Sequence, residues 1–205
     1  MLKTAFGLIT AGVGGLYTVL LDEACDGMET VACRAKGAFR HAEQKPLVGD
    51  RVEVRYDDAN PAETAVIREI LARKNALIRP PMANLDTLFI MLACASPAPI
   101  LPMIDKLICI AEHNHIEPVI LIGKRDLNPA YADELLSVYR NAGFAAFCVS
   151  SQSGEGADAL KDYIQTQLPG RIAAFAGASG VGKSTLLNMI AGILSPTKGK
   201  ILIEI

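Results

Sequence analysis

One octapeptide near the end of the sequence constrains the fold more than any other feature. Residues 177–184 satisfy the pattern GxxxxGK[ST] at every fixed position. The apolar residues 172–176 precede it within a strand predicted at residues 171–176, and residues 183–194 follow as a predicted helix. A glycine-rich turn between a strand and a helix can wrap its backbone amides around phosphate oxygens. The sequence therefore predicts a phosphate-binding P-loop inside an α/β domain.

The chemistry of such a loop assigns roles to its residues. The lysine would reach the β- and γ-phosphates of a nucleotide, and the hydroxyl of Ser184 would ligate Mg²⁺. The glycines allow the backbone to approach the phosphates closely. The predicted nucleotide-binding residues of this loop are Gly177, Ala178, Ser179, Gly180, Val181, Gly182, Lys183, Ser184 and Thr185.

The remainder of the second half alternates between strand and helix patterns. Predicted helices separate the predicted strands, and this rhythm is typical of a mainly parallel sheet with helices on both faces. Ligands of such sheets bind at the carboxyl ends of the strands. The predicted strands are residues 87–93, 118–122, 145–149, 171–176 and 201–205, and the predicted helices are residues 100–114, 131–142, 156–167 and 183–194.

The first eighty residues have a different pattern, with short alternating runs separated by glycine-containing turns. Five strands at this spacing predict a small barrel of the oligonucleotide/oligosaccharide-binding (OB) type, with a small open sheet as the alternative. The strands are predicted at residues 5–10, 16–21, 29–34, 51–56 and 65–71. The paired prolines of Arg79-Pro80-Pro81 exclude a helix at the junction. We therefore expect two domains, residues 1–80 and 81–205.

Two segments that follow predicted strands resemble the guanine-reading segments of GTPases. Gly123-Lys124-Arg125-Asp126 resembles the NKxD motif, with glycine in place of asparagine. The motif's aspartate accepts two hydrogen bonds from guanine and its lysine packs over the base, which implies these roles for Asp126 and Lys124. Ser150-Ser151-Gln152 resembles the loop whose backbone amide reads the guanine oxygen. Taken singly, an exposed turn and a polar helix cap are the alternatives.

The order of these motifs identifies a family resemblance. In most GTPases the P-loop precedes the guanine-reading segments, whereas here it follows them. The chain thus resembles the circularly permuted GTPases, specifically the ribosome small-subunit-dependent (RsgA/YjeQ-like) family. The resemblance runs from about residue 7 to about residue 188. Further matching segments are Gly14-Gly15-x-Tyr17, Cys33-Arg34-Ala35-x-Gly37-x-Phe39-Arg40, Pro46-Leu47-Val48-Gly49-Asp50 and Arg73-Lys74-Asn75 through Asn84-x-Asp86.

The resemblance implies a function and a set of partners. Members couple GTP hydrolysis to late maturation of the small ribosomal subunit, which implies GTP or GDP, Mg²⁺ and ribosomal RNA as ligands. The net charge of −2 gives no global positive field, so an RNA contact must be local. We expect it at Arg34, Lys36 and Arg40. The longest apolar run, residues 88–95, is too short to cross a bilayer, and the five cysteines lack CxxC spacing. A cytoplasmic monomer without membrane contact is expected.

The sequence departs from the family after the P-loop. Members continue with a switch threonine, a DxxG loop and a zinc domain, and no matching residues follow Ser184 here. Residues 186–203 instead resemble the segment after the P-loop of ABC-type ATPases. We therefore expect a GTPase core truncated at its C-terminal side, with no catalytic residue, no zinc ligands and impaired hydrolysis. The alternatives are an RNA-binding OB module with a damaged nucleotide site and an ABC-type ATP-binding fragment.

Overall fold

The computed structural model describes residues 2–25, 28–35, 39, 45–57 and 59–193. The chain divides into two compact units, the first ending at Asn84 and the second beginning at Leu85. Within the described ranges, no helix is both long and apolar enough to cross a membrane. The strand predicted at residues 201–205 lies outside these ranges.

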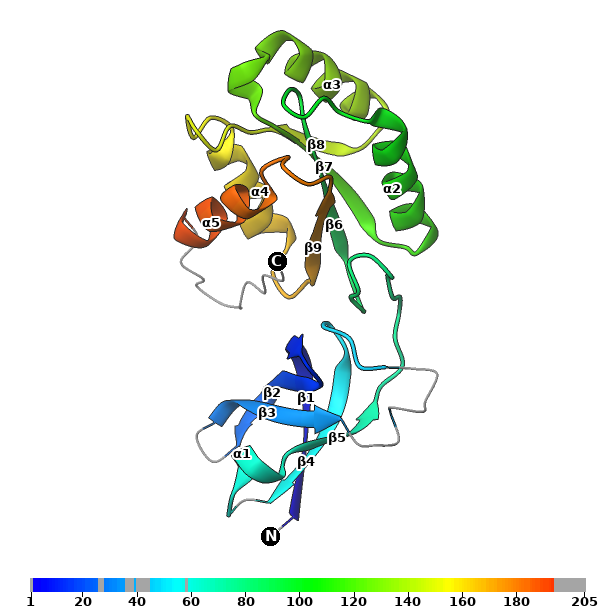
Figure 1. Ribbon diagram of the computed structural model, residues 1–205, viewed down its shortest axis with the longest axis vertical. Helices are drawn as coiled ribbons and strands as arrows, with labels where there is room; N and C mark the ends of the chain where they lie inside the picture. The colour runs from blue at the N-terminus through cyan, green and yellow to red at the C-terminus, as the bar shows by residue number, and fades with distance from the viewer. Residues whose placement is uncertain (1, 26–27, 36–38, 40–44, 58, 194–205) are drawn as a thin grey trace. The chain divides into compact units, whose positions relative to one another are not determined.

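The first unit is a closed five-stranded barrel (Figure 1). Its strand order is β1-β2-β3-β5-β4, and antiparallel pairing of β1 with β4 closes it. The OB-fold prediction is confirmed, and the open-sheet alternative is wrong. The elements are β1 (Leu2–Val13), β2 (Leu16–Cys25), β3 (Met28–Ala35), β4 (Arg51–Asp57), the short helix α1 (Pro61–Thr64) and β5 (Val66–Ile70).

Alternating side chains fill the inside of the barrel, because successive residues of a strand point to opposite faces. In β4, Val52 and Val54 are fully buried while Arg55 is exposed. Apolar residues from the other strands complete the core, among them Ile9, Val19, Val31 and Ile67. Hydrophobic burial is therefore the main term that stabilises the barrel.

A buried ion pair fixes the chain at the start of β4. The Asp50 side chain is fully buried, and its oxygens accept hydrogen bonds from Arg73 Nε at 2.6 Å and Nη2 at 2.7 Å. Its Oδ2 also accepts a 2.7 Å bond from the backbone amide of Leu47. Arg73 Nη2 in addition donates to the carbonyl oxygen of Lys45 at 2.6 Å. One guanidinium thus holds the segment before β4 against the segment after β5.

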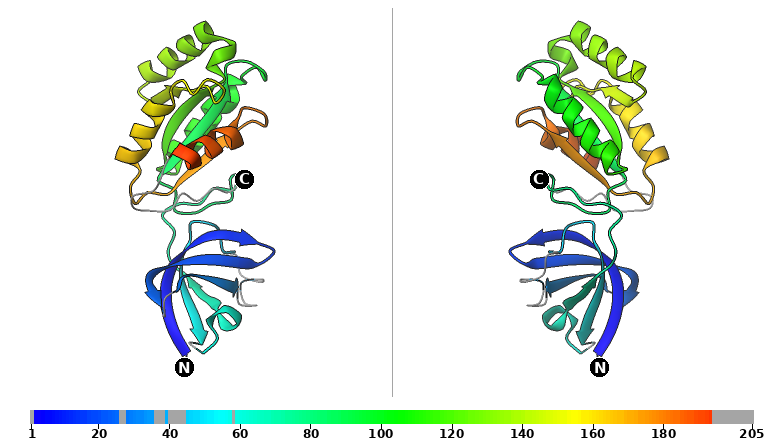
Figure 2. Two further views of the ribbon diagram at one scale, coloured as in Figure 1. Left: turned by 90° about the vertical axis from the view of Figure 1, so that its left-hand side faces the viewer. Right: turned by 90° about the vertical axis from the view of Figure 1, so that its right-hand side faces the viewer.

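The second unit is a parallel four-stranded sheet in the order β8-β7-β6-β9. Helices α2 and α3 lie on one side of it, and α4 and α5 on the other (Figure 1 and Figure 2). The elements are β6 (Thr87–Ala93), α2 (Leu101–His113), β7 (Glu117–Gly123), a 3₁₀ turn (Arg125–Leu127), α3 (Pro129–Asn141), β8 (Ala145–Cys148), α4 (Ala157–Gln167), β9 (Ala173–Gly177) and α5 (Lys183–Ile193). This is the predicted P-loop core in the permuted order.

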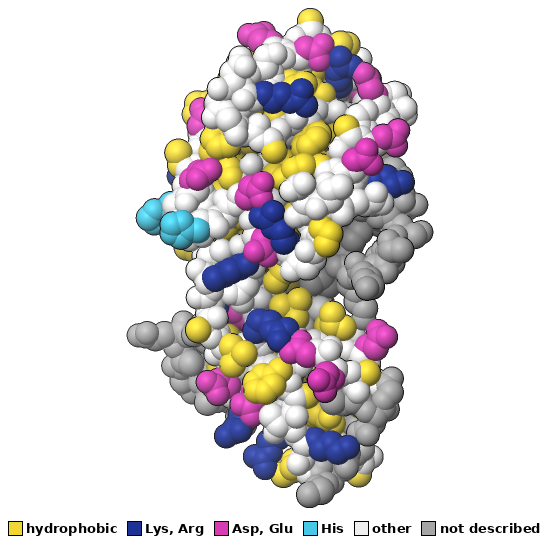
Figure 3. Space-filling view, turned by 180° about the vertical axis from the view of Figure 1, so that it is seen from behind, with side chains coloured by type: hydrophobic (Ala, Val, Ile, Leu, Met, Phe, Trp, Pro, Cys, Tyr) yellow, Lys and Arg dark blue, Asp and Glu magenta, His cyan; other side chains and the backbone are white. Residues whose placement is uncertain are grey.

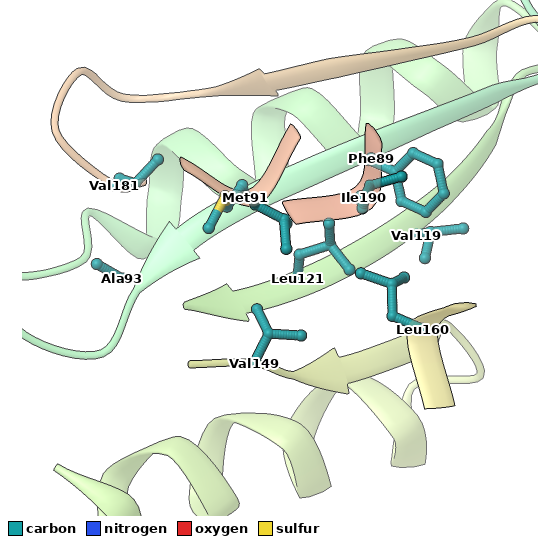
Figure 4. Packing of buried hydrophobic residues seen from close by; sticks show 10 residues of the cluster. Phe89, Met91, Ala93, Val119, Leu121, Val149, Leu160, Val181 and Ile190 are labelled. Carbon is teal, nitrogen blue, oxygen red and sulfur yellow. The ribbon is translucent and has the colours of Figure 1, made fainter. Parts of the chain in front are cut away.

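The central strand β6 is buried along its whole length, as expected for a parallel strand covered by helices on both faces. Phe89, Met91 and Ala93 pack into a cluster with residues of β7, α4 and α5 (Figure 4). Val181 of the P-loop belongs to the same cluster, so the loop is anchored in the core.

The side chain of Asn128 caps the N-terminus of α3, where its Oδ1 accepts a 3.3 Å hydrogen bond from the amide of Tyr131.

Replacing Arg73 with alanine tests the ion pair of the barrel. The change would leave Asp50 buried without its cation, so we expect the free energy of unfolding to fall by about 3 to 5 kcal/mol. The matched control is Arg51→Ala, whose partner Asp22 is exposed; its cost should be at most about 1 kcal/mol. Denaturant unfolding measures both values. If both variants lost the same free energy of unfolding, burial of the Asp50–Arg73 pair would not add to its contribution to stability.

Candidate functional site

The carboxyl ends of all four parallel strands meet at one edge of the sheet. Met91 of β6 is paired with Gly177 of β9, and Ala93 of β6 with Gly123 of β7. The next pairing, between β7 and β8, reaches Cys148. The P-loop, the turn after Gly123 and the loop after Cys148 consequently begin at the same edge (Figure 1). The predicted nucleotide-binding segments are thus brought together.

The P-loop runs from Gly177, the last residue of β9, to Ser184, the second residue of α5. Gly177 has φ +147°, and a Cβ atom there would lie 2.2 Å from the backbone oxygen of Met91, so only glycine fits. The ammonium group of Lys183 donates to the carbonyl oxygens of Gly177 at 2.8 Å and Ala178 at 2.7 Å. Burial lowers the pKa of Lys183. The side chains of Ser184 and Thr185 are exposed at the first turn of α5.

The Lys124-Arg125-Asp126 turn leaves the sheet directly after β7. Lys124 has left-handed backbone geometry, with φ +59°, and its ammonium group donates to the carbonyl oxygen of Ser96. The thiol of Cys94 donates to the carbonyl oxygen of Lys124 at 3.0 Å. Burial raises the pKa of this thiol, which favours the protonated donor. Asp126 lies exposed in the 3₁₀ turn.

A hydrogen bond joins this turn to the loop after β8. Ser150 is fully buried, and its hydroxyl donates to Asp126 Oδ1 at 2.6 Å. The Ser150 Oγ atom in turn accepts bonds from the amides of Gln152 at 3.3 Å and Ser153 at 3.2 Å. Ser151 follows as a half-buried residue. Two segments predicted separately as guanine readers are therefore in direct contact.

The terminal methyl of Met91 occupies the space beside Gly123. A Cβ atom at this position would lie 2.7 Å from the terminal methyl of Met91 and 3.2 Å from the carbonyl oxygen of Val181. Met91 thus fills the space between the end of β7 and the P-loop. Sequence reasoning missed this residue, because it is one of several apolar residues in a continuously buried strand.

An apolar pocket adjoins the P-loop on the side of α2. Its walls include Pro97, Ile100 and Met103, and the P-loop contributes Ala178 and Val181. The P-loop therefore forms one wall of this pocket, and the other walls are mainly apolar.

The predicted RNA-contact residues are only partly described. Arg34 is exposed on β3, where it is paired with Leu16 of β2 and Val66 of β5. Lys36 and Arg40 lie outside the described residues. Lys45 is exposed, and its carbonyl oxygen accepts a hydrogen bond from Arg73.

Comparisons with known proteins decide the family. The RsgA GTPase family profile matches residues 70–202, and the RsgA N-terminal domain profile matches residues 6–63. The chain belongs to the RsgA GTPase family. Within it, the small ribosomal subunit biogenesis GTPase RsgA of Agathobacter rectalis is 37% identical over 191 residues, covering 90% of this chain and 62% of that protein. The RsgA of Caldanaerobacter subterraneus subsp. tengcongensis is 41% identical over 185 residues, covering 90% and 59%.

Solved RsgA-type structures share the fold. The crystal structure of YjeQ from Thermotoga maritima superposes with a TM-score of 0.73 at 33% identity, covering 94% of this chain and 66% of that one. YloQ, a circularly permuted GTPase, superposes with a TM-score of 0.71 at 33% identity, covering 93% and 66%. The chain thus spans about three fifths of the length of the curated RsgA relatives reported above.

The close approach at Gly177 gives a test of the RsgA P-loop geometry. Gly177→Ala would place a methyl group against the Met91 carbonyl, whereas Gly143→Ala, at φ +93°, would meet nothing within 4 Å. Left-handed backbone geometry alone should cost Gly143→Ala about 1 to 2 kcal/mol. Gly177→Ala should cost more, because β9 or β6 must also move. Thermal unfolding measures both, and equal costs would argue against this approach of the two strands.

Proposed function

We propose that this chain binds guanine nucleotides at the carboxyl edge of its sheet and acts in assembly of the small ribosomal subunit. The observation that carries the proposal is the convergence of Lys183, Asp126 and Ser150 on that edge. The second support is family membership, since both relatives described above are named small ribosomal subunit biogenesis GTPases. That work would take place in the cytoplasm.

The P-loop would bind the phosphates. The loop leads into the start of α5, where the helix dipole favours an anion. Lys183 now donates to two carbonyl oxygens of the loop, and its partial burial penalises the charge. A phosphate oxygen would offer that ammonium a charged acceptor, which is a stronger partner. The exposed hydroxyl of Ser184 fits a ligand of Mg²⁺, a metal that prefers oxygen donors.

The base would be read by the two connected segments. Asp126 would accept the hydrogen bonds of guanine, Lys124 would pack over the ring, and an amide near Ser151 would donate to the guanine oxygen. The hydroxyl of Ser150 orients the Asp126 carboxylate without adding a charge. Adenine presents a different donor pattern, so an aspartate at this place favours guanine.

The barrel would contact ribosomal RNA. Basic and acidic side chains are interspersed on the face that Figure 3 shows, so phosphate binding requires a local basic segment. Arg34 on β3 and the adjoining Lys36 and Arg40 form such a segment in the sequence. An OB barrel with basic residues on its surface, such as the exposed Arg34, is suited to RNA binding.

Base selectivity tests the nucleotide site. The unchanged chain should bind fluorescent GDP more tightly than fluorescent ADP, and Asp126→Asn should reduce that preference about tenfold or more, because it removes charged hydrogen bonds to the base. Lys183→Ala should weaken both nucleotides and serves as the control for phosphate binding. Equal affinities of the unchanged chain for GDP and ADP would refute a guanine site.

Salt-dependent binding to small ribosomal subunits tests the RNA contact. Replacing Arg34, Lys36 and Arg40 together with alanine should weaken binding and flatten its dependence on salt, because fewer counterions are released. A control variant that replaces Arg51, Arg55 and Arg68 removes the same charge from β4 and β5. Similar losses in both variants would mean that overall charge, and not this segment, drives binding.

A further inference from the structure

Arg125 connects three segments at the proposed base-binding edge. It lies in the 3₁₀ turn between Lys124 and Asp126. Its guanidinium donates to both carboxylate oxygens of Asp133 in α3, with Nη2 at 2.9 Å and 3.1 Å and Nε at 3.2 Å. Its Nη1 also donates to the carboxylate of Glu155 in the loop after β8. The Arg125 guanidinium therefore links the turn at residues 124–126, called the base turn below, to both α3 and the loop after β8.

The loop that Glu155 belongs to is closed upon itself. The amide of Ser150 donates to the carbonyl oxygen of Glu155 at 2.9 Å, and the amide of Gly154 donates to the carbonyl oxygen of Ser150 at 2.9 Å. Side chains attach this closed loop to the base turn at both of its ends. Ser150 bonds Asp126 at the start of the loop, and Glu155 bonds Arg125 at its end.

These two attachments differ in what they can fix. The Ser150 hydroxyl makes one hydrogen bond to Asp126, and a single bond of this kind fixes one contact point rather than an orientation. The planar guanidinium binds Asp133 through two nitrogens, which sets its orientation, and it presents a third nitrogen to Glu155. The Arg125 side chain therefore constrains the orientation of the loop relative to Asp126 in addition to the Ser150 bond and the backbone bond from the Arg125 amide to the Val149 carbonyl oxygen.

We propose that Arg125 is a positioning residue for base selection, holding the Asp126 turn and the Ser150–Ser151 segment in the relative placement that guanine requires. This inference rests on the proposed guanine site. Arg125 itself need not touch the base, since its guanidinium is occupied by the two carboxylates. The alternative is that Arg125 forms surface ion pairs that contribute only to stability. Ion pairs with carboxylates as exposed as those of Asp133 and Glu155 usually contribute little to the free energy of unfolding.

The two readings predict different binding data for Arg125→Gln in the full chain. If Arg125 positions the base readers, affinity for GDP should fall about five- to tenfold, equivalent to one net hydrogen bond. Affinity for ADP should stay unchanged, since the phosphate contacts of the P-loop remain. Isothermal titration with GDP and ADP measures both, and thermal unfolding without nucleotide reports stability.

Arg171→Gln is the matched control. Arg171 forms a 2.6 Å pair with Glu117 at the opposite end of the same sheet, and both side chains are similarly exposed. This variant should keep the full preference for GDP with a similar change in unfolding temperature. Glu155→Gln should reproduce part of the Arg125→Gln loss, and adding it to Arg125→Gln should cost little more, because both changes break the same contact.

The outcomes separate this inference from the proposed function. If the unchanged chain prefers GDP and Arg125→Gln retains that preference, the positioning role is overturned while the guanine site stands. Parallel weakening of GDP and ADP would also overturn it, since the effect would then lie in the phosphate loop or the fold. Equal affinity of the unchanged chain for GDP and ADP would reject both.

Discussion

The parallel pairing of β6 with β7 on one side and β9 on the other is the constraint on which the candidate site depends. Strands that run in the same direction end at the same edge, so pairing Met91 with Gly177 and Ala93 with Gly123 leaves no choice about where the following loops begin. Segments separated by tens of residues in the chain become neighbours without any contact of their own. Hydrogen bonds such as that between Ser150 and Asp126 then refine an arrangement that the sheet has already made.

The sequence was a good guide wherever the signal is local. A buried parallel strand is a continuous apolar run, so β6 was predicted with its observed bounds, and the P-loop pattern located β9 and α5 to within a few residues. The contact between Asp126 and Ser150 was not predictable, because 24 residues separate them and each fits an ordinary polar turn. Arg125 was passed over for the same reason, since its partners Asp133 and Glu155 lie in other elements.

In the barrel, too, local features were predictable from the sequence and a long-range contact was not. Alternating patterns and glycine turns were enough to predict five strands, because burial on one face leaves a period of two. The pair between Asp50 and Arg73 has no periodic signature, and its significance comes only from the full burial of Asp50. Of the three basic residues expected to contact RNA, the structure places only Arg34, which lies exposed on β3.

The packing of Met91 against Gly123 has an evolutionary consequence. The space that a side chain at 123 would use is taken by the end of a flexible thioether, with the Val181 carbonyl just beyond it. A larger residue at 123 therefore requires either a shorter residue at 91 or a rotamer of Met91 that withdraws the methyl. The two positions, on neighbouring strands and far apart in sequence, are therefore coupled through one methyl group, and the room available at 123 depends on the conformation of the side chain at 91.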